Sequence, residues 1–231
     1  MESLVLHFLV LFPTISILSY FLISDRFPEP KKLIFYTFLF GLIMTFLVGL
    51  TKGILYLFIS EQGPFFTAFI DAAFIEELGK FLVLYLFCVR FTHFNEPMDG
   101  IVYGTVVSLS FATYENYEYV FRSDEFVMNY VTGYVRALSA VPMHAFCGVV
   151  MGFFIGKHFF RSKNEKSYLG LALIIPILFH GFYNYSLMEN DLSQYFNLVI
   201  LAILTGVTIF LHNNLKKTQM NKNKEEELKR Y

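Results

Sequence analysis

Two adjacent glutamates and a lysine form the pattern in this chain that is best suited to chemistry. Glu76 and Glu77 lie about 100° apart on a helix, and Lys80 follows them by four and three residues, so its ammonium can reach either carboxylate. An apolar environment disfavours an ionised carboxylate, whereas a neighbouring lysine favours it. The pattern therefore predicts one ionised and one neutral carboxylate, the pairing that general acid/base catalysis uses.

Further polar side chains recur with helical spacing. His180 and Asn184 are four residues apart, and Glu115 and Glu118 are three apart, so each pair shares one helix face. His144 stands alone in an apolar run. No serine or cysteine stands out as a nucleophile with a base at helical spacing, and the apolar setting of Cys147 suggests that it serves packing.

The composition places these side chains in a membrane. The chain of 231 residues is 55% hydrophobic and 16% charged, whereas soluble domains are about 25% charged. Its apolar runs are continuous, unlike the alternating strands of a membrane β-barrel, so we expect an all-α polytopic membrane bundle. Seven stretches reach spanning length, at 3–23, 33–59, 65–90, 99–121, 131–157, 168–188 and 194–212. The net charge of -1 gives no argument for a nucleic-acid partner.

The basic residues predict an orientation in the cell membrane. Nearly all of them fall on one side of the seven spans, so the N-terminus should lie outside and the C-terminus in the cytoplasm. The first span has no basic n-region or cleavage site and should be retained. We expect one transmembrane domain over 1–215 and a charged cytoplasmic tail over 216–231.

Charged residues inside the spans must be sheltered together. Each costs about 2.5 to 3.5 kcal/mol at the bilayer centre. From the outer ends of their spans, Glu77 and His144 lie roughly 20 Å deep, His180 roughly 12 Å and Glu115 roughly 9 Å. These depths predict a shared polar cavity that opens outward. Three charged residues nearer the outer face are expected to be structural, through pairing or snorkelling: Lys52, Asp71 and Arg136. Glu118 shares a helix face with Glu115, and its role is left open between structural and functional.

The order of these motifs resembles the PrsW family of intramembrane proteases, over about residues 25–188. The matching segments are the Asp25–Pro30 loop, Glu76-Glu77-x-x-Lys80, Phe111–Asn116, His144 with a glycine-dotted run to Gly156, and His180-Gly181-x-x-Asn184. The type II CAAX prenyl proteases share similar motifs, but the position of Lys80 looks more like PrsW.

The resemblance implies hydrolysis of a peptide bond near the extracytoplasmic boundary of a single-span membrane protein, in PrsW-like proteins an anti-sigma factor. In that setting Glu77 or Glu76 would activate water with His144. His180 and Asn184 would face the developing oxyanion, and Lys80 would keep the second carboxylate ionised.

The sequence leaves the metal open. His144, His180 and Glu115 are compatible with a zinc site that has one open position, and the same residues suit hydrolysis without metal. Two other classes also stay open: an ion-coupled transporter, disfavoured by small size and no inverted repeat, and a non-proteolytic membrane scaffold.

Overall fold

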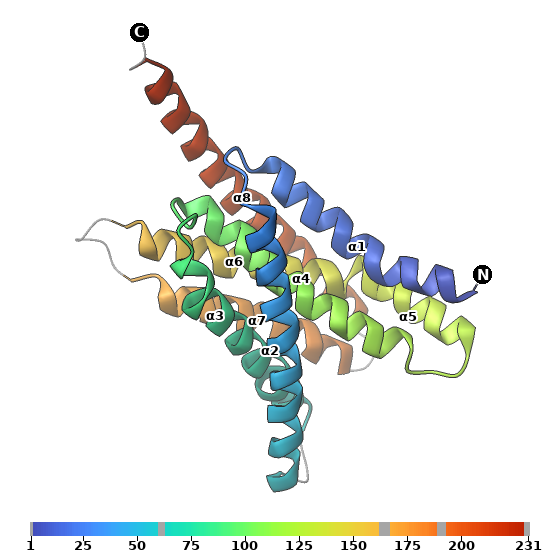
Figure 1. Cartoon of the computed structure of the whole chain (residues 1–231). Helices are drawn as coiled ribbons and strands as arrows, with labels where there is room; N and C mark the ends of the chain where they lie inside the picture. Colours follow the sequence, from blue (N-terminus) through green and yellow to red (C-terminus); the bar gives the residue numbers. More distant parts are fainter. Residues whose placement is uncertain (1, 60–62, 162–166, 189–192, 229–231) are drawn as a thin grey trace.

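The chain folds as a bundle of helices that encloses one central helix (Figure 1). The structure, a computed structural model, describes residues 2–59, 63–161, 167–188 and 193–228. The helices within these ranges are α1 (Glu2–Ser24), α2 (Lys31–Phe58), the π-helix η1 (Phe66–Phe74), α3 (Ile75–Leu86), the short 3-10 helix η2 (Cys88–Arg90), α4 (Pro97–Val120), α5 (Phe126–Leu138), α6 (Ala140–Phe159), α7 (Leu169–Met188) and α8 (Ser193–Leu228). The predicted all-α membrane bundle is confirmed.

Five helical segments of the described ranges are long and apolar enough to cross a membrane: α1, α2, 126–159, α7 and 195–221. The other two predicted spans, η1 with α3 and α4, are helical as expected, but they carry most of the charged and small polar residues. Neighbouring helices shelter them, and every residue of α4 from Met98 to Thr113 is buried. Conversely, α1 and α2 expose large apolar side chains such as Ile23 and Phe58, as lipid contact requires.

Two predicted helices differ in detail. The span expected at 131–157 begins at Phe126 and breaks at Ser139, where α5 ends and α6 begins. The charged tail expected over 216–231 begins within α8, since that helix continues to Leu228. Gln219, in this stretch, is buried. Residues 229–231 of that predicted tail lie outside the described residues.

The contact between α4 and α6 rests on glycines, as the spacing of Gly148, Gly152 and Gly156 indicates. A β-carbon at Gly148 would lie 2.5 Å from the carbonyl oxygen of Gly104, and one at Gly152 would overlap the backbone of Gly100. Small residues let the two backbones approach closely in the membrane. This contact fixes α6, and with it His144, against α4, the central helix of the bundle.

The loop after α1 is tied to the end of the bundle opposite the cavity described below. Gln219 of α8 donates hydrogen bonds to Asp25, at 2.8 Å, and to Glu96, and the hydroxyl of Tyr103 donates to Glu29. Burial raises the pKa of Asp25, although its hydrogen bonds oppose the shift. This network joins the α1–α2 loop to α4 and α8.

Candidate active site

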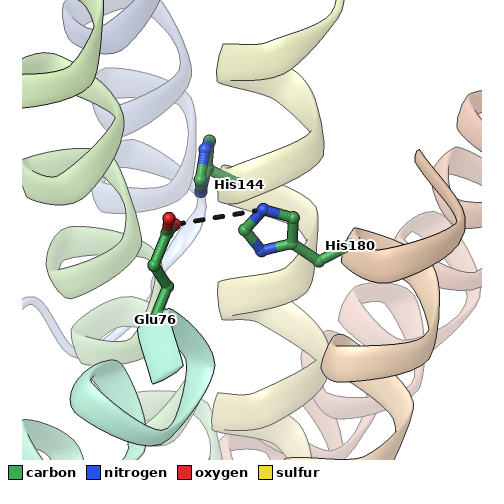
Figure 2. Close-up of side chains that lie close together, drawn as sticks. All are labelled: Glu76, His144 and His180. Carbon is green, nitrogen blue, oxygen red and sulfur yellow. Dashed lines mark ion pairs between the residues drawn. The ribbon is translucent and has the colours of Figure 1, made fainter. Parts of the chain in front are cut away.

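Three buried side chains from three helices converge at the centre of the bundle (Figure 2). Glu76 comes from the first turn of α3, His144 from α6 and His180 from α7. One ligand atom from each lies within 4.8 Å of the others. Their exposed fractions are 6%, 1% and 2%. Buried groups of this kind at matched depth are what the sequence predicts for a shared polar site.

The backbone just before Glu76 is unusual. Residues Phe66–Phe74 form a π-helix, whose turns are wider than those of the α-helix that begins at Ile75. Such π segments are rare and occur frequently at functional sites. The change in helical phase sets the direction in which the two glutamates of the first turn of α3 point.

Glu76 has one oxygen bound and one available. Its Oε1 accepts a hydrogen bond from Nζ of Lys52 on α2, at 2.7 Å. Its Oε2 is buried and accepts no hydrogen bond from the described residues, and it lies 3.9 Å from Nε2 of His180. The available oxygen therefore faces an imidazole nitrogen at a separation that one water molecule can bridge.

Glu77 is enclosed by the protein. It is 0% exposed, and its Oε1 accepts from Nζ of Lys80 at 2.6 Å and from Nδ1 of His180 at 2.8 Å. The sequence left open which of the two glutamates contacts substrate. The cavity is lined by Glu76, whereas Glu77 is not among its lining residues.

The partners of the two histidines determine where their protons lie. An ionised Glu77 can only accept, so Nδ1 of His180 carries the proton and Nε2 keeps a lone pair. Lys80 as an ammonium can only donate, at 2.9 Å, so Nδ1 of His144 keeps a lone pair and its Nε2 carries the proton. Nε2 of His144 then donates to Glu115, at 3.2 Å. The two imidazoles thus present opposite faces: His180 an acceptor, His144 a donor.

A cavity of about 660 Å³ gives access to this group. Its lining includes Glu76, Glu115, His144, His180 and Asn184. The cavity lies toward the C-terminal ends of α2, α4 and α7 and the junction of α5 and α6. Under the predicted orientation these ends face outward, so the geometry agrees with the expected shared polar cavity.

Structural pairing was expected of Lys52 and Arg136, and each pairs with a carboxylate that lines the cavity. Lys52 binds Glu76, and Arg136 binds Glu115 at 3.1 Å and Asn116 at 2.7 Å. Asp71, which accepts from Tyr56 at 2.9 Å, also lines the cavity. Their charge within predicted spans was the available signal, but sequence alone does not tell which carboxylate a long cation reaches.

The residues fit a divalent metal, with one change of ligand. Two imidazoles and a carboxylate are a common set for catalytic zinc, and the group that meets the distance requirement contains Glu76 where we expected Glu115. The unbonded Oε2 of Glu76 and the lone pair of His180 Nε2 are suitable ligand atoms, and Glu77 orients that imidazole by accepting from its other ring nitrogen. His144 can join them once its Nε2 gives up its proton.

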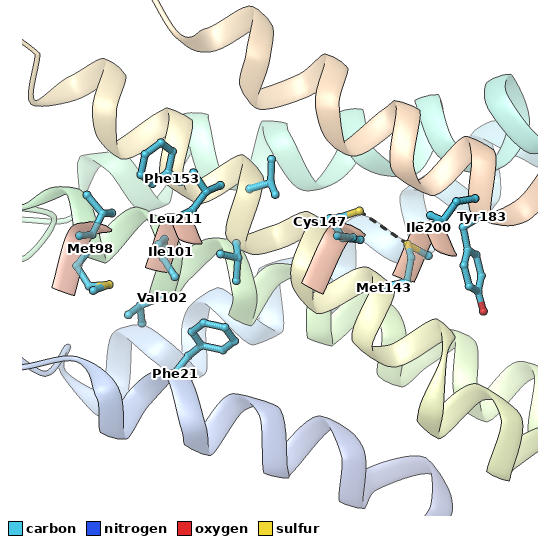
Figure 3. Close-up of a cluster of buried hydrophobic side chains, with 14 of the residues drawn as sticks. Phe21, Met98, Ile101, Val102, Met143, Cys147, Phe153, Tyr183, Ile200 and Leu211 are labelled. Carbon is cyan, nitrogen blue, oxygen red and sulfur yellow. Dashed lines mark hydrogen bonds between the residues drawn. The ribbon is translucent and has the colours of Figure 1, made fainter. Parts of the chain in front are cut away.

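The cysteines do not provide a nucleophile. Cys147 is fully buried in an apolar cluster drawn from α1, α4, α6, α7 and α8, where its Sγ contacts Met143 (Figure 3). Cys88 is likewise buried and free. The expectation that Cys147 serves packing is confirmed.

Comparison with known proteins agrees with this geometry. The model of a family described as PrsW family intramembrane metalloprotease matches residues 29–211. Proteins named Protease PrsW from Geobacillus kaustophilus and Bacillus subtilis are each 35% identical to this chain, over 83% of its length and 84% and 87% of theirs. Protease PrsW of Clostridioides difficile is 31% identical over 85% of this chain and 82% of its own. No solved structure matches the chain.

Proposed function

The chain belongs to the PrsW family of intramembrane metalloproteases, and from this premise we propose that Glu76 activates the water that cleaves a membrane-anchored substrate. The chain is a multi-pass membrane peptidase. This membership favours proteolysis over ion-coupled transport. It also favours the PrsW family over the CAAX prenyl proteases. The observation that carries the proposal is the unbonded Oε2 of Glu76, a residue that lines the cavity, at 3.9 Å from Nε2 of His180.

Water is activated between these two acceptors. A water that donates one hydrogen to Oε2 of Glu76 and the other to Nε2 of His180 presents its oxygen lone pairs to a peptide carbonyl. Oε2 of Glu76 takes the proton as the oxygen attacks, and the same carboxyl group then protonates the leaving amine. Glu77 keeps the proton of His180 on Nδ1, because it accepts from that ring nitrogen, and so leaves Nε2 able to accept from the water.

The oxyanion faces donors on the other side of the site. His144 carries its proton on Nε2 while Lys80 donates to Nδ1, so His144 rather than His180 is the imidazole suited to donate. To do so its Nε2–H turns from Glu115, to which it donates at 3.2 Å, to the oxyanion. Asn184, which lines the same cavity, supplies a second donor from α7. These roles exchange the two histidines relative to the assignment based on sequence, while Lys80 keeps its role beside the second carboxylate.

In a metal-bound form of the site, Glu76, His144 and His180 would hold a divalent cation, of which zinc is the commonest for this ligand set. The cation would supply a Lewis acid beside the scissile carbonyl. These three residues would then serve as ligands, so the proton roles given above describe the site without the metal. The ligands would be held in place by Lys52, Glu77 and Lys80.

The substrate class follows from the cavity and the predicted orientation. A cavity near the outward ends of α2, α4 and α7 favours a bond close to the extracytoplasmic boundary of a single-span protein. On the resemblance to PrsW proteins, we assign an anti-sigma factor as the substrate and site-1 cleavage as the reaction.

Cleavage of a tagged anti-sigma factor co-expressed with the chain tests the proposal. Glu76→Gln should reduce cleavage by at least about 100-fold, the usual contribution of a general base, while the protein remains folded in detergent. Glu125→Gln, an exposed carboxylate at the start of α5, is the matched control and should cleave like the wild type. Cleavage by Glu76→Gln at the wild-type rate would refute the role of Glu76 as the base. If the wild-type protein cleaved no anti-sigma factor, the proposed substrate class would be refuted and a non-proteolytic scaffold would be favoured.

A further inference from the structure

One face of α2 changes from tight packing to open space along its length. Gly41, Thr45, Gly49 and Gly53 recur every four residues and therefore share that face. At Gly41 the face packs on α4, since a β-carbon there would overlap the side chain of Ser110, and Thr45 is buried. At Gly49 and Gly53 no atom of another described segment lies within 4 Å of an added β-carbon. The contact with α4 thus ends after Thr45, but the small residues continue.

The open part of this face is a wall of the catalytic cavity. Thr45, Gly49 and Gly53 all line the cavity, as does Glu76. Tyr114 of α4 and Val135 of α5 line it from other helices. In Figure 1 the C-terminal half of α2 extends beyond its crossing with α4.

The cavity behind the face is lined by a carboxylate with one oxygen that accepts no hydrogen bond from the described residues. The side chain of Glu76 is buried, and its Oε2 accepts no hydrogen bond from the described residues. Lys52, the residue next to Gly53, holds the other oxygen of that carboxylate at 2.7 Å. A segment seated on Gly49 and Gly53 would therefore lie beside the proposed catalytic base.

We propose that the Thr45–Gly49–Gly53 face of α2 is the docking surface for the transmembrane helix of the substrate. This inference rests on the proposed function and adds the binding mode. Helices associate in lipid through close packing and not through the hydrophobic effect, and small residues let backbones approach. The substrate helix continues the contact that α4 makes at Gly41, with its own small residues against Gly49 and Gly53.

A photo-crosslinking residue at position 53 tests docking without requiring cleavage. It is introduced into the Glu76→Gln variant, which is co-expressed with a tagged, membrane-anchored anti-sigma factor. We expect a crosslink to the transmembrane helix of that probe. Position 206 on α8 is the control, because Gly206 also has open space around it but lies outside the cavity, and it should give no crosslink. Crosslinks at position 53 to lipid alone would overturn the proposal.

Cleavage by leucine variants separates this inference from the proposed function. Gly53→Leu should slow cleavage of the same probe by at least about tenfold, because the added side chain occupies the docking surface. Gly206→Leu should not change the rate, and neither variant should lose folding, since both sites are open and leucine favours helix. Equal rates for Gly53→Leu and wild type would overturn docking while leaving the protease intact. A crosslink at position 53 without cleavage by wild-type protein would instead support docking and refute hydrolysis.

Discussion

Lys52 offers the sharpest test of how the site is held together. Its Nζ lies 2.7 Å from Oε1 of Glu76, and no other described residue donates to that oxygen within the hydrogen-bond limit. Lys52→Met keeps the length of the side chain and removes the charge. We expect slower cleavage, because a buried carboxylate then loses the contact that orients it toward His180.

The magnitude follows from the geometry of the pair. A hydrogen bond to a charged group contributes about 1.5 to 3 kcal/mol. The Lys52 side chain is 22% exposed, and solvent screening places the effect in the lower part of that range. A loss of about 1.5 to 2 kcal/mol corresponds to a rate roughly 10 to 30 times slower.

The experiment compares five variants in reconstituted membranes, Glu76→Gln alone among them. Lys52→Met should be slow, and Lys52→Arg should recover much of the rate, because a guanidinium can still donate to Oε1. Lys217→Met, an exposed lysine on α8, controls for the loss of a positive charge. The double variant Lys52→Met/Glu76→Gln completes a double-mutant cycle, in which the free energy of unfolding is measured by thermal denaturation. There the double variant should lose about 1 to 3 kcal/mol less than the sum of the single variants.

Two outcomes would refute this account. Wild-type cleavage by Lys52→Met would show that the contact does not position Glu76. Additive losses of stability in the cycle would show that the two side chains do not interact in the folded protein.

The remaining predictions concern the metal and the packing of α6. Purified wild-type protein should contain about one zinc per chain, measured by elemental mass spectrometry, and His180→Ala should lose it. A chelator should stop cleavage and added zinc should restore it, whereas full activity of metal-free protein would support hydrolysis by Glu76 without metal. Gly152→Ala should lower the stability by about 1 to 3 kcal/mol, because its methyl group would overlap the backbone of Gly100. Gly206→Ala, whose surroundings are open, should not lower the stability in the same thermal assay, and equal values for the two variants would contradict the close α4–α6 contact.

Much of the site could be predicted from the chain because lipid is a demanding solvent. Charged groups within spans are costly, so Glu76, Glu77, Lys80 and Glu115 stood out once the apolar runs were drawn. Helical spacing then placed His180 and Asn184 on one face, and depth placed His144 near them. These inferences need only the period of a helix and the thickness of a membrane.

The roles of neighbouring residues could not be predicted in the same way. Helical spacing allows Lys80 to reach Glu76 or Glu77, and it does not reveal that Lys52 from another helix takes the first and leaves Lys80 to the second. The π-helix before Glu76 also changes the helical phase in a way that an apolar pattern does not reveal. The sequence therefore favoured Glu115 as the carboxylate ligand, whereas the structure groups Glu76 with the two histidines.

The sequence by itself determined the compartment, the helices and the small set of polar residues that could do chemistry, because each follows from local composition and period. Only the tertiary structure decided which oxygen of which glutamate faces the cavity, which histidine donates and where α2 is left open. Those properties depend on how helices cross, and a crossing such as that of α2 over α4 is set by contacts between residues distant in the chain, Gly41 and Ser110 among them.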